Sequence, residues 1–264
     1  MNAFFTVFAF VSTVIFPGCY MQGVQGSNGS EQIVADQSKG AKAPVLVELF
    51  TSEGCSSCPP ADSLLIELDR EQPVDGAEII TLGFHVDYWN EGGWRDRFSS
   101  GDFTRRQQAY ANHLESGSTY TPEAVIDGTI EAVGNSDRNI KNGISSRISV
   151  PKAVISSEIV ADKINVDISN IPSSKASTVY LAVAENELNS SVSGGENGGR
   201  HLSHASVVRD MRRIGKIDAG QSNGKFEMKL PKNSGWKAAN LRYVIFVQEN
   251  SSMKVIGVKR ITPQ

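Results

Sequence analysis

The feature that most constrains this chain is residues 45–60, where an apolar strand leads through a glycine turn into two cysteines and then a helix. Cys55 and Cys58 are separated by two residues, and Pro59 and Pro60 follow in the first helical turn, where missing N–H groups cost little. A thiol at a helix N-terminus faces free backbone N–H groups and the positive end of the helix dipole, so its pKa falls. This order predicts thiol–disulfide chemistry, with Cys55 as the more exposed attacking thiolate and Cys58 as the thiol that resolves a mixed disulfide.

Cysteine usage leaves few alternatives to that chemistry. The chain has three cysteines, Cys19, Cys55 and Cys58, so the expected folded part has none left for a further disulfide. A single C-x-x-C is half of a zinc site, and no second C-x-x-C completes it. The four histidines keep a zinc or copper site open as a lesser alternative. We find no glycine-rich phosphate loop and no Ser–His–Asp signature, and we expect neither an organic cofactor nor a resident metal.

Composition is that of a soluble globular protein, with 39% hydrophobic and 21% charged residues. The formal net charge of −3 argues against nucleic acid as a partner, because nucleic-acid binding usually needs a clustered basic face. The expected partner is instead a protein or small-thiol substrate.

The N-terminus is expected to direct export. Residues 4–16 are almost entirely apolar, too short for a typical membrane span but the right length for a signal-peptide core. We assign residues 1–19 as a signal peptide that ends at Cys19. Lipidation of Cys19, which would anchor the protein to a membrane, and simple cleavage nearby both stay open. Residues 20–43 are rich in Gly, Ser, Gln and Asn and are expected to form a flexible linker, so the protein would be periplasmic or a membrane-anchored lipoprotein.

Residues 44–150 are predicted to form an α/β domain with the order β–α–β–α–β–β–α. Apolar spacing at i, i+3, i+4 and i+7 marks the first helix, and Asp102 is a plausible N-cap of the second. An Asp127-Gly128 turn between two apolar runs predicts a hairpin. The expected strands are residues 45–50, 79–87 and both arms of 120–134, and the later helices are residues 102–114 and 139–148.

Residues 151–264 alternate apolar and polar positions in short runs, such as residues 163–168, 179–184 and 243–248. This pattern predicts an all-β domain, a small sandwich-like unit that follows the first domain.

Several motifs together resemble a known family. The element order, the C-x-x-C after the first strand, and Thr121-Pro122 opening the hairpin resemble a thioredoxin fold. More narrowly, the chain resembles the exported thioredoxin-like proteins of the DUF1223 family. The motifs are Glu48-Leu49-Phe50-Thr51-Ser52 with Gly54-Cys55-Ser56-Ser57-Cys58-Pro59-Pro60, His85-Val86-Asp87-Tyr88-Trp89, Arg106-Gln107 with Tyr110, Tyr120-Thr121-Pro122, and Gly195-Glu196-Asn197 with His204 and Val207-Val208-Arg209.

The resemblance implies roles for three further residues. In thioredoxin-like proteins the proline before the third strand is cis and lies against the dithiol, so Pro122 would expose the backbone of Thr121 to a substrate. A buried acid on the first strand takes a proton from the resolving thiol, which makes Glu48 a candidate proton acceptor. The alternatives are an ordinary turn proline, and a glutamate that faces solvent or forms a salt bridge.

Acidic and histidine neighbours complicate this interpretation. Glu53 and Asp62 flank the cysteines and would raise the pKa of the thiolate. His85 with Asp87, and His201 with His204 if helical, are candidate metal ligands, although polar contacts within loops are the simpler alternative. The functional expectation is thiol–disulfide exchange, with a non-catalytic binding or assembly module as the runner-up and copper or zinc handling as the third hypothesis.

Overall fold

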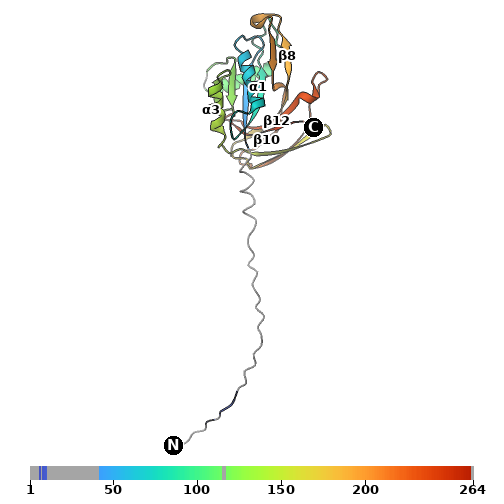
Figure 1. Cartoon of the computed structure of the whole chain (residues 1–264). Coiled ribbons are helices and arrows are strands. Elements are labelled where there is room, and N and C mark those ends of the chain that lie inside the picture. The colour runs from blue at the N-terminus through green and yellow to red at the C-terminus, as the bar shows by residue number, and fades with distance from the viewer. Residues whose placement is uncertain (1–5, 7, 11–41, 115–116, 263–264) are drawn as a thin grey trace. The chain divides into compact units, whose positions relative to one another are not determined.

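The computed structural model describes residues 6, 8–10, 42–114 and 117–262 of the 264-residue chain (Figure 1). Most of the predicted signal peptide and linker, including Cys19, lies outside the described residues. Phe8 and Phe10 are described and are fully exposed. None of the helices that the structure describes is long and apolar enough to cross a membrane.

An eight-stranded mixed sheet is the framework of the part from Lys42 onward, which forms one unit. Its strand order is β13-β12-β7-β10-β2-β1-β3-β4, so strands from both sides of the predicted boundary at residue 150 belong to one sheet. The junction is between β2 and β10, where Val207 lies opposite Gly83 in parallel register. A Cβ on Gly83 would lie 3.3 Å from the carbonyl oxygen of Ala205, so this close approach favours glycine.

The elements predicted between residues 44 and 150 are all present, and the α/β class is confirmed. One detail was wrong, because Ser100 and not Asp102 is the N-cap of α2, and its side chain accepts the N–H of Asp102. The elements are β1 (Ala43–Thr51), α1 (Pro59–Glu71), β2 (Ala77–His85), α2 (Gly101–His113), β3 (Glu123–Ile126), β4 (Ile130–Val133) and α3 (Asp137–Arg147).

The alternation of side chains along β1 divides the core between the two faces of the sheet. Val45, Val47 and Leu49 pack with α1 and α3 on one face. Leu46 and Phe50 pack with α2 on the other. The intervening Glu48 therefore points to the α2 face, away from the helix that begins at Cys58.

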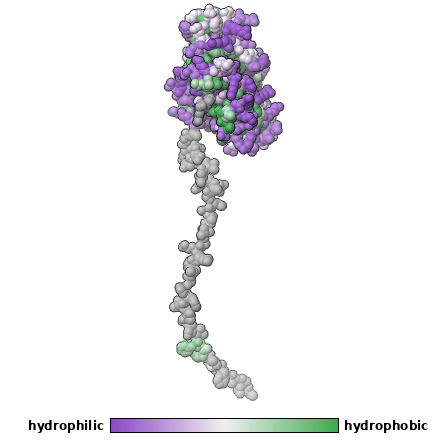
Figure 2. Space-filling view, turned by 90° about the vertical axis from the view of Figure 1, so that its right-hand side faces the viewer, coloured by the Kyte–Doolittle hydropathy of each residue, from purple (hydrophilic) through white to green (hydrophobic). Residues whose placement is uncertain are grey.

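The C-terminal half supplies the other strands of the large sheet and two smaller antiparallel sheets. The three-stranded sheet β11-β6-β5 packs against β7 and β12 around a core that includes Ile164, Leu181 and Ile245. The two layers pack like a sandwich, but one of them is the large sheet shared with β1 and β2. The outer face shown in Figure 2 is mostly hydrophilic. The elements are β5 (Val154–Val160), β6 (Lys163–Ser169), β7 (Ser177–Glu185), β8 (Leu188–Ser191), η1 (Gly195–Asn197), β9 (His201–His204), β10 (Val207–Ile217), β11 (Gly224–Lys229), η2 (Ala238–Asn240), β12 (Leu241–Glu249) and β13 (Val255–Ile261).

Candidate functional site

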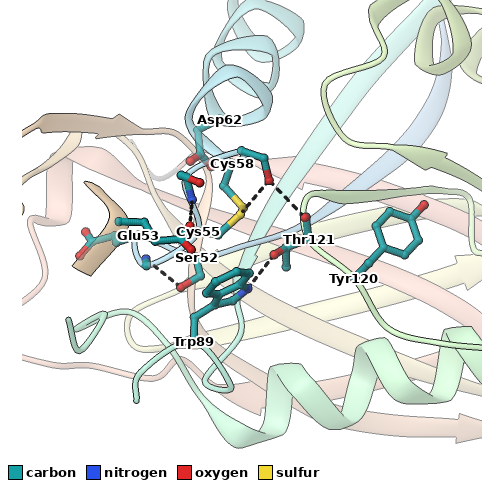
Figure 3. The surroundings of a disulfide bond; sticks show 12 residues. Ser52, Glu53, Cys55, Cys58, Asp62, Trp89, Tyr120 and Thr121 are labelled. Atoms are coloured by element: carbon teal, nitrogen blue, oxygen red, sulfur yellow. Dashed lines mark hydrogen bonds between the residues drawn. A yellow bond between two sulfur atoms is a disulfide. The ribbon is translucent and has the colours of Figure 1, made fainter. Parts of the chain in front are cut away.

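Cys55 and Cys58 form a disulfide at the start of α1 (Figure 3). Their Cα atoms are 5.4 Å apart, and Cys58 is the N-cap residue of the helix. Both cysteines are 0% exposed, so the expectation that Cys55 is accessible was wrong for this oxidised state. The apolar strand and the proline-led helix position the pair as predicted, and other parts of the chain cover it.

Thr121 and Pro122 lie beside the disulfide loop, joined by a cis peptide bond as predicted. The Ser57 hydroxyl donates to the carbonyl oxygen of Thr121 at 3.5 Å, and the Trp89 indole N–H donates to the Thr121 hydroxyl at 2.7 Å. A Cβ on Gly54 would lie 3.1 Å from the Cβ of Trp89, so Trp89 approaches the turn before the cysteines closely. The structure thus brings four predicted site residues together, Cys55, Cys58, Thr121 and Pro122.

Glu48 is not brought to the disulfide. It is fully buried, and its two oxygens accept from Arg106 Nε at 2.5 Å and Nη2 at 2.9 Å. The Tyr110 hydroxyl also donates to Glu48 at 2.6 Å. Burial would lower the pKa of Arg106, but the charge of Glu48 outweighs burial and raises it. The salt-bridged alternative is therefore the one observed, and it occupies the carboxylate that the resemblance suggested as a proton acceptor.

A segment of the C-terminal half covers the disulfide loop. The buried Asn197 side chain donates to the carbonyl oxygens of Glu53 and Cys55, each at 2.9 Å. The Glu196 carboxylate accepts the N–H of Ser56, between the two cysteines, at 3.0 Å. A Cβ on Gly194 would lie 2.5 Å from the carbonyl oxygen of Gly93, so glycine permits this segment to approach. The sequence singled out Gly195-Glu196-Asn197 as a motif, but its role became visible only in three dimensions.

A buried charge cluster lies on the other side of the same loop. His204 Nε2 is 3.4 Å from Glu53 Oε1, and His204 Nδ1 is 3.7 Å from Asp62 Oδ2. The Trp94 indole donates to the second Glu53 oxygen at 2.8 Å. Burial opposes charge on His204, but Asp62 and Glu53 outweigh it and raise the pKa of His204 to about 9. Burial likewise opposes charge on Glu53, yet the neighbouring His204, together with the Trp94 indole, lowers the pKa of Glu53.

His85 extends this cluster. Its ring lies edge-on to that of His204, with centroids 4.9 Å apart, and its Nδ1 is 2.6 Å from Asp96 Oδ2. The same Asp96 oxygen accepts the N–H of Glu53 at 2.9 Å, which ties the cluster back to the disulfide loop. Burial would raise the pKa of Asp96, but His85 and the backbone donors lower it. His85 therefore contacts the site through Asp96 and His204.

The expectations about metal ligands are corrected. His201 and His204 are on strand β9 and not on a helix, so the first is exposed and the second is buried. No group of three or more His, Cys, Asp or Glu side chains within the described ranges is arranged to hold a metal ion. Asp87 accepts from the Thr104 hydroxyl at 2.5 Å, a contact that joins the loop after β2 to α2.

Comparison with known proteins identifies the family. A family model described as "Protein of unknown function (DUF1223)" matches residues 46–248. The chain belongs to the DUF1223 family. A crystal structure of protein AGR_C_4864 from Agrobacterium tumefaciens is similar, with 26% identity, a TM-score of 0.68, and coverage of 85% of this chain and 96% of that one.

Other similarities are weak. A domain of the outer membrane lipoprotein Omp28 from Porphyromonas gingivalis has 16% identity and a TM-score of 0.24, over 42% of this chain and 92% of that one. No curated protein matches.

The DUF1223 chain also carries a buried acid beside Pro122 that the sequence did not single out. Glu123 opens β3, and one of its oxygens accepts from the Gln107 amide at 2.6 Å while the other has no hydrogen-bond partner among the residues that the structure describes. Burial raises the pKa of Glu123 to about 7. In the sequence, only the position of Glu123 directly after Pro122 could have marked it as a site residue.

A cavity of about 900 Å³ in the described part of this DUF1223 protein lies away from the disulfide. It is formed between α2 and the strands β7, β10 and β12, with Arg106 and Tyr180 among its lining residues. The cysteines and the Thr121–Pro122 segment do not line this cavity. The candidate site is therefore the disulfide loop with the residues packed against it, and the cavity is separate from that site.

Proposed function

We propose that this DUF1223 protein is an exported, thioredoxin-like protein that exchanges thiols and disulfides through Cys55 and Cys58. The substrate is a protein or a small thiol. The observation that carries the proposal is a cysteine pair bridged across the N-terminus of α1, with Thr121 and Pro122 beside it. The thioredoxin-like assignment is supported by the order β–α–β–α–β–β–α, with β1 and β2 parallel and β3 and β4 antiparallel to their neighbours. Export, with or without a lipid on Cys19, rests on the apolar N-terminal run.

The exchange balances as two displacements at sulfur. A substrate thiolate attacks Sγ of Cys55, the bond between Cys55 and Cys58 breaks, and Cys58 leaves as a thiolate that solvent protonates. A second substrate thiolate then attacks the substrate sulfur of the mixed disulfide and releases Cys55. The substrate loses two electrons and the cysteine pair gains them, and the reverse sequence reduces a substrate disulfide.

Access is the step that the oxidised state restricts. Because both cysteines are fully buried, part of the surrounding chain has to move before a substrate reaches Cys55, and release of the contacts of Glu196 and Asn197 with the loop would open a route. Thr121 is half-buried, and its backbone would then be available for strand-like pairing with a substrate.

The same burial favours a second candidate function. A disulfide that is 0% exposed and held by a buried asparagine is what a purely structural bridge would show. In that case the protein is a binding or assembly module and the disulfide stiffens the loop.

Trapping separates the two candidates. The full-length Cys58→Ser variant is incubated with glutathione disulfide, and the peptide that contains Cys55 is analysed by mass spectrometry. Exchange predicts a stable mixed disulfide on Cys55, because the resolving thiol is missing. The Cys55→Ser variant, in which Cys58 is free, is the matched control and should form much less adduct. If Cys55 in the folded Cys58→Ser variant takes up no glutathione, the structural bridge is the better account.

A further inference from the structure

The two acids that flank the cysteines are the feature that the proposed reaction leaves unexplained. Glu53 is two residues before Cys55, and Asp62 is one helical turn after Cys58. Both are buried, at 0% and 6% exposure. Uncompensated buried carboxylates this close to the cysteines in the sequence would disfavour a thiolate at the helix N-terminus.

We propose that His204 is a positioning residue of the thiol–disulfide site: its imidazolium offsets Glu53 and Asp62 and thereby keeps Cys55 able to form a thiolate. This inference rests on the proposed function for its significance. It adds a role for the C-terminal half, which delivers His204 on β9 against α1.

The geometry places a single ring between the two acids. Nε2 is 3.4 Å from Glu53 Oε1 and Nδ1 is 3.7 Å from Asp62 Oδ2, so the ring of His204 lies within ion-pair distance of two different carboxylates. The ring is buried, and neither nitrogen has a hydrogen-bond partner within the described residues, so the contacts with the two acids are ion-pair contacts. Only the doubly protonated ring presents an N–H to both acids, since a neutral imidazole has one N–H.

The surroundings of His204 agree with a charged ring. The titratable groups packed around it are Glu53 before the cysteines, Asp62 on α1, His85 on β2, and Asp96 behind His85. Three of these four are acids. Phe98 packs edge-on to the ring with centroids 5.8 Å apart, and His204 is buried, so the imidazolium acts through low-dielectric surroundings.

The consequence concerns Cys55 directly. With His204 charged, the loop around the cysteines carries one cation against Glu53 and Asp62, and the helix N-terminus still favours the thiolate. If the cation is removed, both carboxylates act on Cys55 without compensation. The pKa of the Cys55 thiol should then rise by about one unit, which is a tenfold loss of thiolate at any pH well below it.

The test follows the ionisation of Cys55 without any substrate. In full-length Cys58→Ser protein with ¹³C-labelled cysteine, the Cβ shift of Cys55 is recorded from pH 4 to pH 10. His204→Gln should raise the pKa of Cys55 by about one unit. Glu53→Gln should lower it by a similar amount, and the double variant Glu53→Gln/His204→Gln should fall between the single variants.

His201→Gln is the matched control. His201 is on the same strand, is exposed, and contacts only the Ser191 hydroxyl among the described polar groups, so it should leave the pKa of Cys55 unchanged. If His204→Gln does not fold, the comparison of Glu53→Gln/His204→Gln with Glu53→Gln decides, because the two proteins differ only in His204 and the double variant should have the higher pKa at Cys55.

An unchanged pKa in the folded variants overturns the role of His204, even if Cys55 still forms a mixed disulfide. If the pKa of Cys55 shifts as expected but Cys55 undergoes no thiol–disulfide exchange, the proposed function is refuted. The electrostatic coupling between His204 and Cys55 would still stand. The two failures are therefore distinguishable.

Discussion

Two buried glutamates five residues apart, Glu48 and Glu53, are neutralised in opposite ways. Glu48 points to the α2 face, where Arg106 binds both of its oxygens and Tyr110 adds a third donor. Glu53 lies in the disulfide loop, where it meets His204 at 3.4 Å and the Trp94 indole at 2.8 Å. Both carboxylates are 0% exposed, so the difference is in the partner and not in burial.

The comparison separates a permanent charge pair from one that can titrate. An arginine stays protonated at any pH the protein meets and matches a carboxylate with two parallel N–H donors. A histidine changes charge near neutral pH unless acids hold its proton. Glu48 on β1 therefore has a permanent counter-charge inside the core. Glu53, which follows β1, has a counter-charge beside the cysteines that can titrate.

The largest effect should come from breaking the fixed pair. Arg106→Met leaves Glu48 buried without a cation and should lower the free energy of unfolding by about 4 kcal/mol. Arg105→Met is the control, since the pair of Arg105 with Asp102 is exposed and should contribute less than about 1 kcal/mol. Urea unfolding with the disulfide intact measures both. A loss below 1 kcal/mol for Arg106→Met would mean that the ion pair does not hold the α2 face.

The pair of Glu53 and His204 predicts that the free energy of unfolding depends on pH with a definite sign. The pKa of His204 is about 9 in the folded protein and near 6.5 when unfolded, so its contribution is complete below pH 6.5 and is lost as pH rises through 9. The free energy of unfolding should fall by about 3 kcal/mol between pH 6 and pH 9.5.

The His204→Gln variant isolates this contribution, because other groups also titrate. Its stability, measured over the same pH range, should fall by less than that of the unaltered protein. Two parallel curves would show that His204 does not carry the extra proton.

A smaller effect on stability is expected from Asn197, in the segment that contacts the disulfide loop. Asn197→Ala removes the two donors to the carbonyl oxygens of Glu53 and Cys55 and should cost about 2 kcal/mol. Asn189→Ala, at an exposed position of β8, should change stability by less than about 0.5 kcal/mol.

The same Asn197→Ala protein should be reduced faster by a water-soluble phosphine, because the loop over the disulfide is released. Equal rates for Asn197→Ala and Asn189→Ala would show that Asn197 does not restrict access.

The N-terminal elements could be predicted because each is encoded locally. The apolar spacing of α1 and the Asp127-Gly128 turn fix their type within a few residues, and the two cysteines are separated by only two residues in the sequence itself. Local pattern also placed β6, β7 and β12 correctly.

The electrostatics could not be predicted in the same way. The sequence marked Glu53 and Asp62 as unfavourable neighbours of the cysteines, but their counter-charge comes from His204, far along the chain. His204 comes close to Glu53 and Asp62 because β10, which directly follows β9, joins the sheet beside β2 at Gly83. No apolar periodicity in the sequence predicts that strand pairing. Glu48 could likewise be expected to be buried, but the choice of Arg106 as its partner follows from the packing of α2.

The most direct test of the account is the reduction potential of the Cys55–Cys58 pair, measured in glutathione and dithiothreitol redox buffers. A pair that exchanges with protein or small-thiol substrates should equilibrate between about −120 and −270 mV, the range of thiol–disulfide oxidoreductases. A value below about −300 mV, typical of structural disulfides, would contradict exchange as the function of this site.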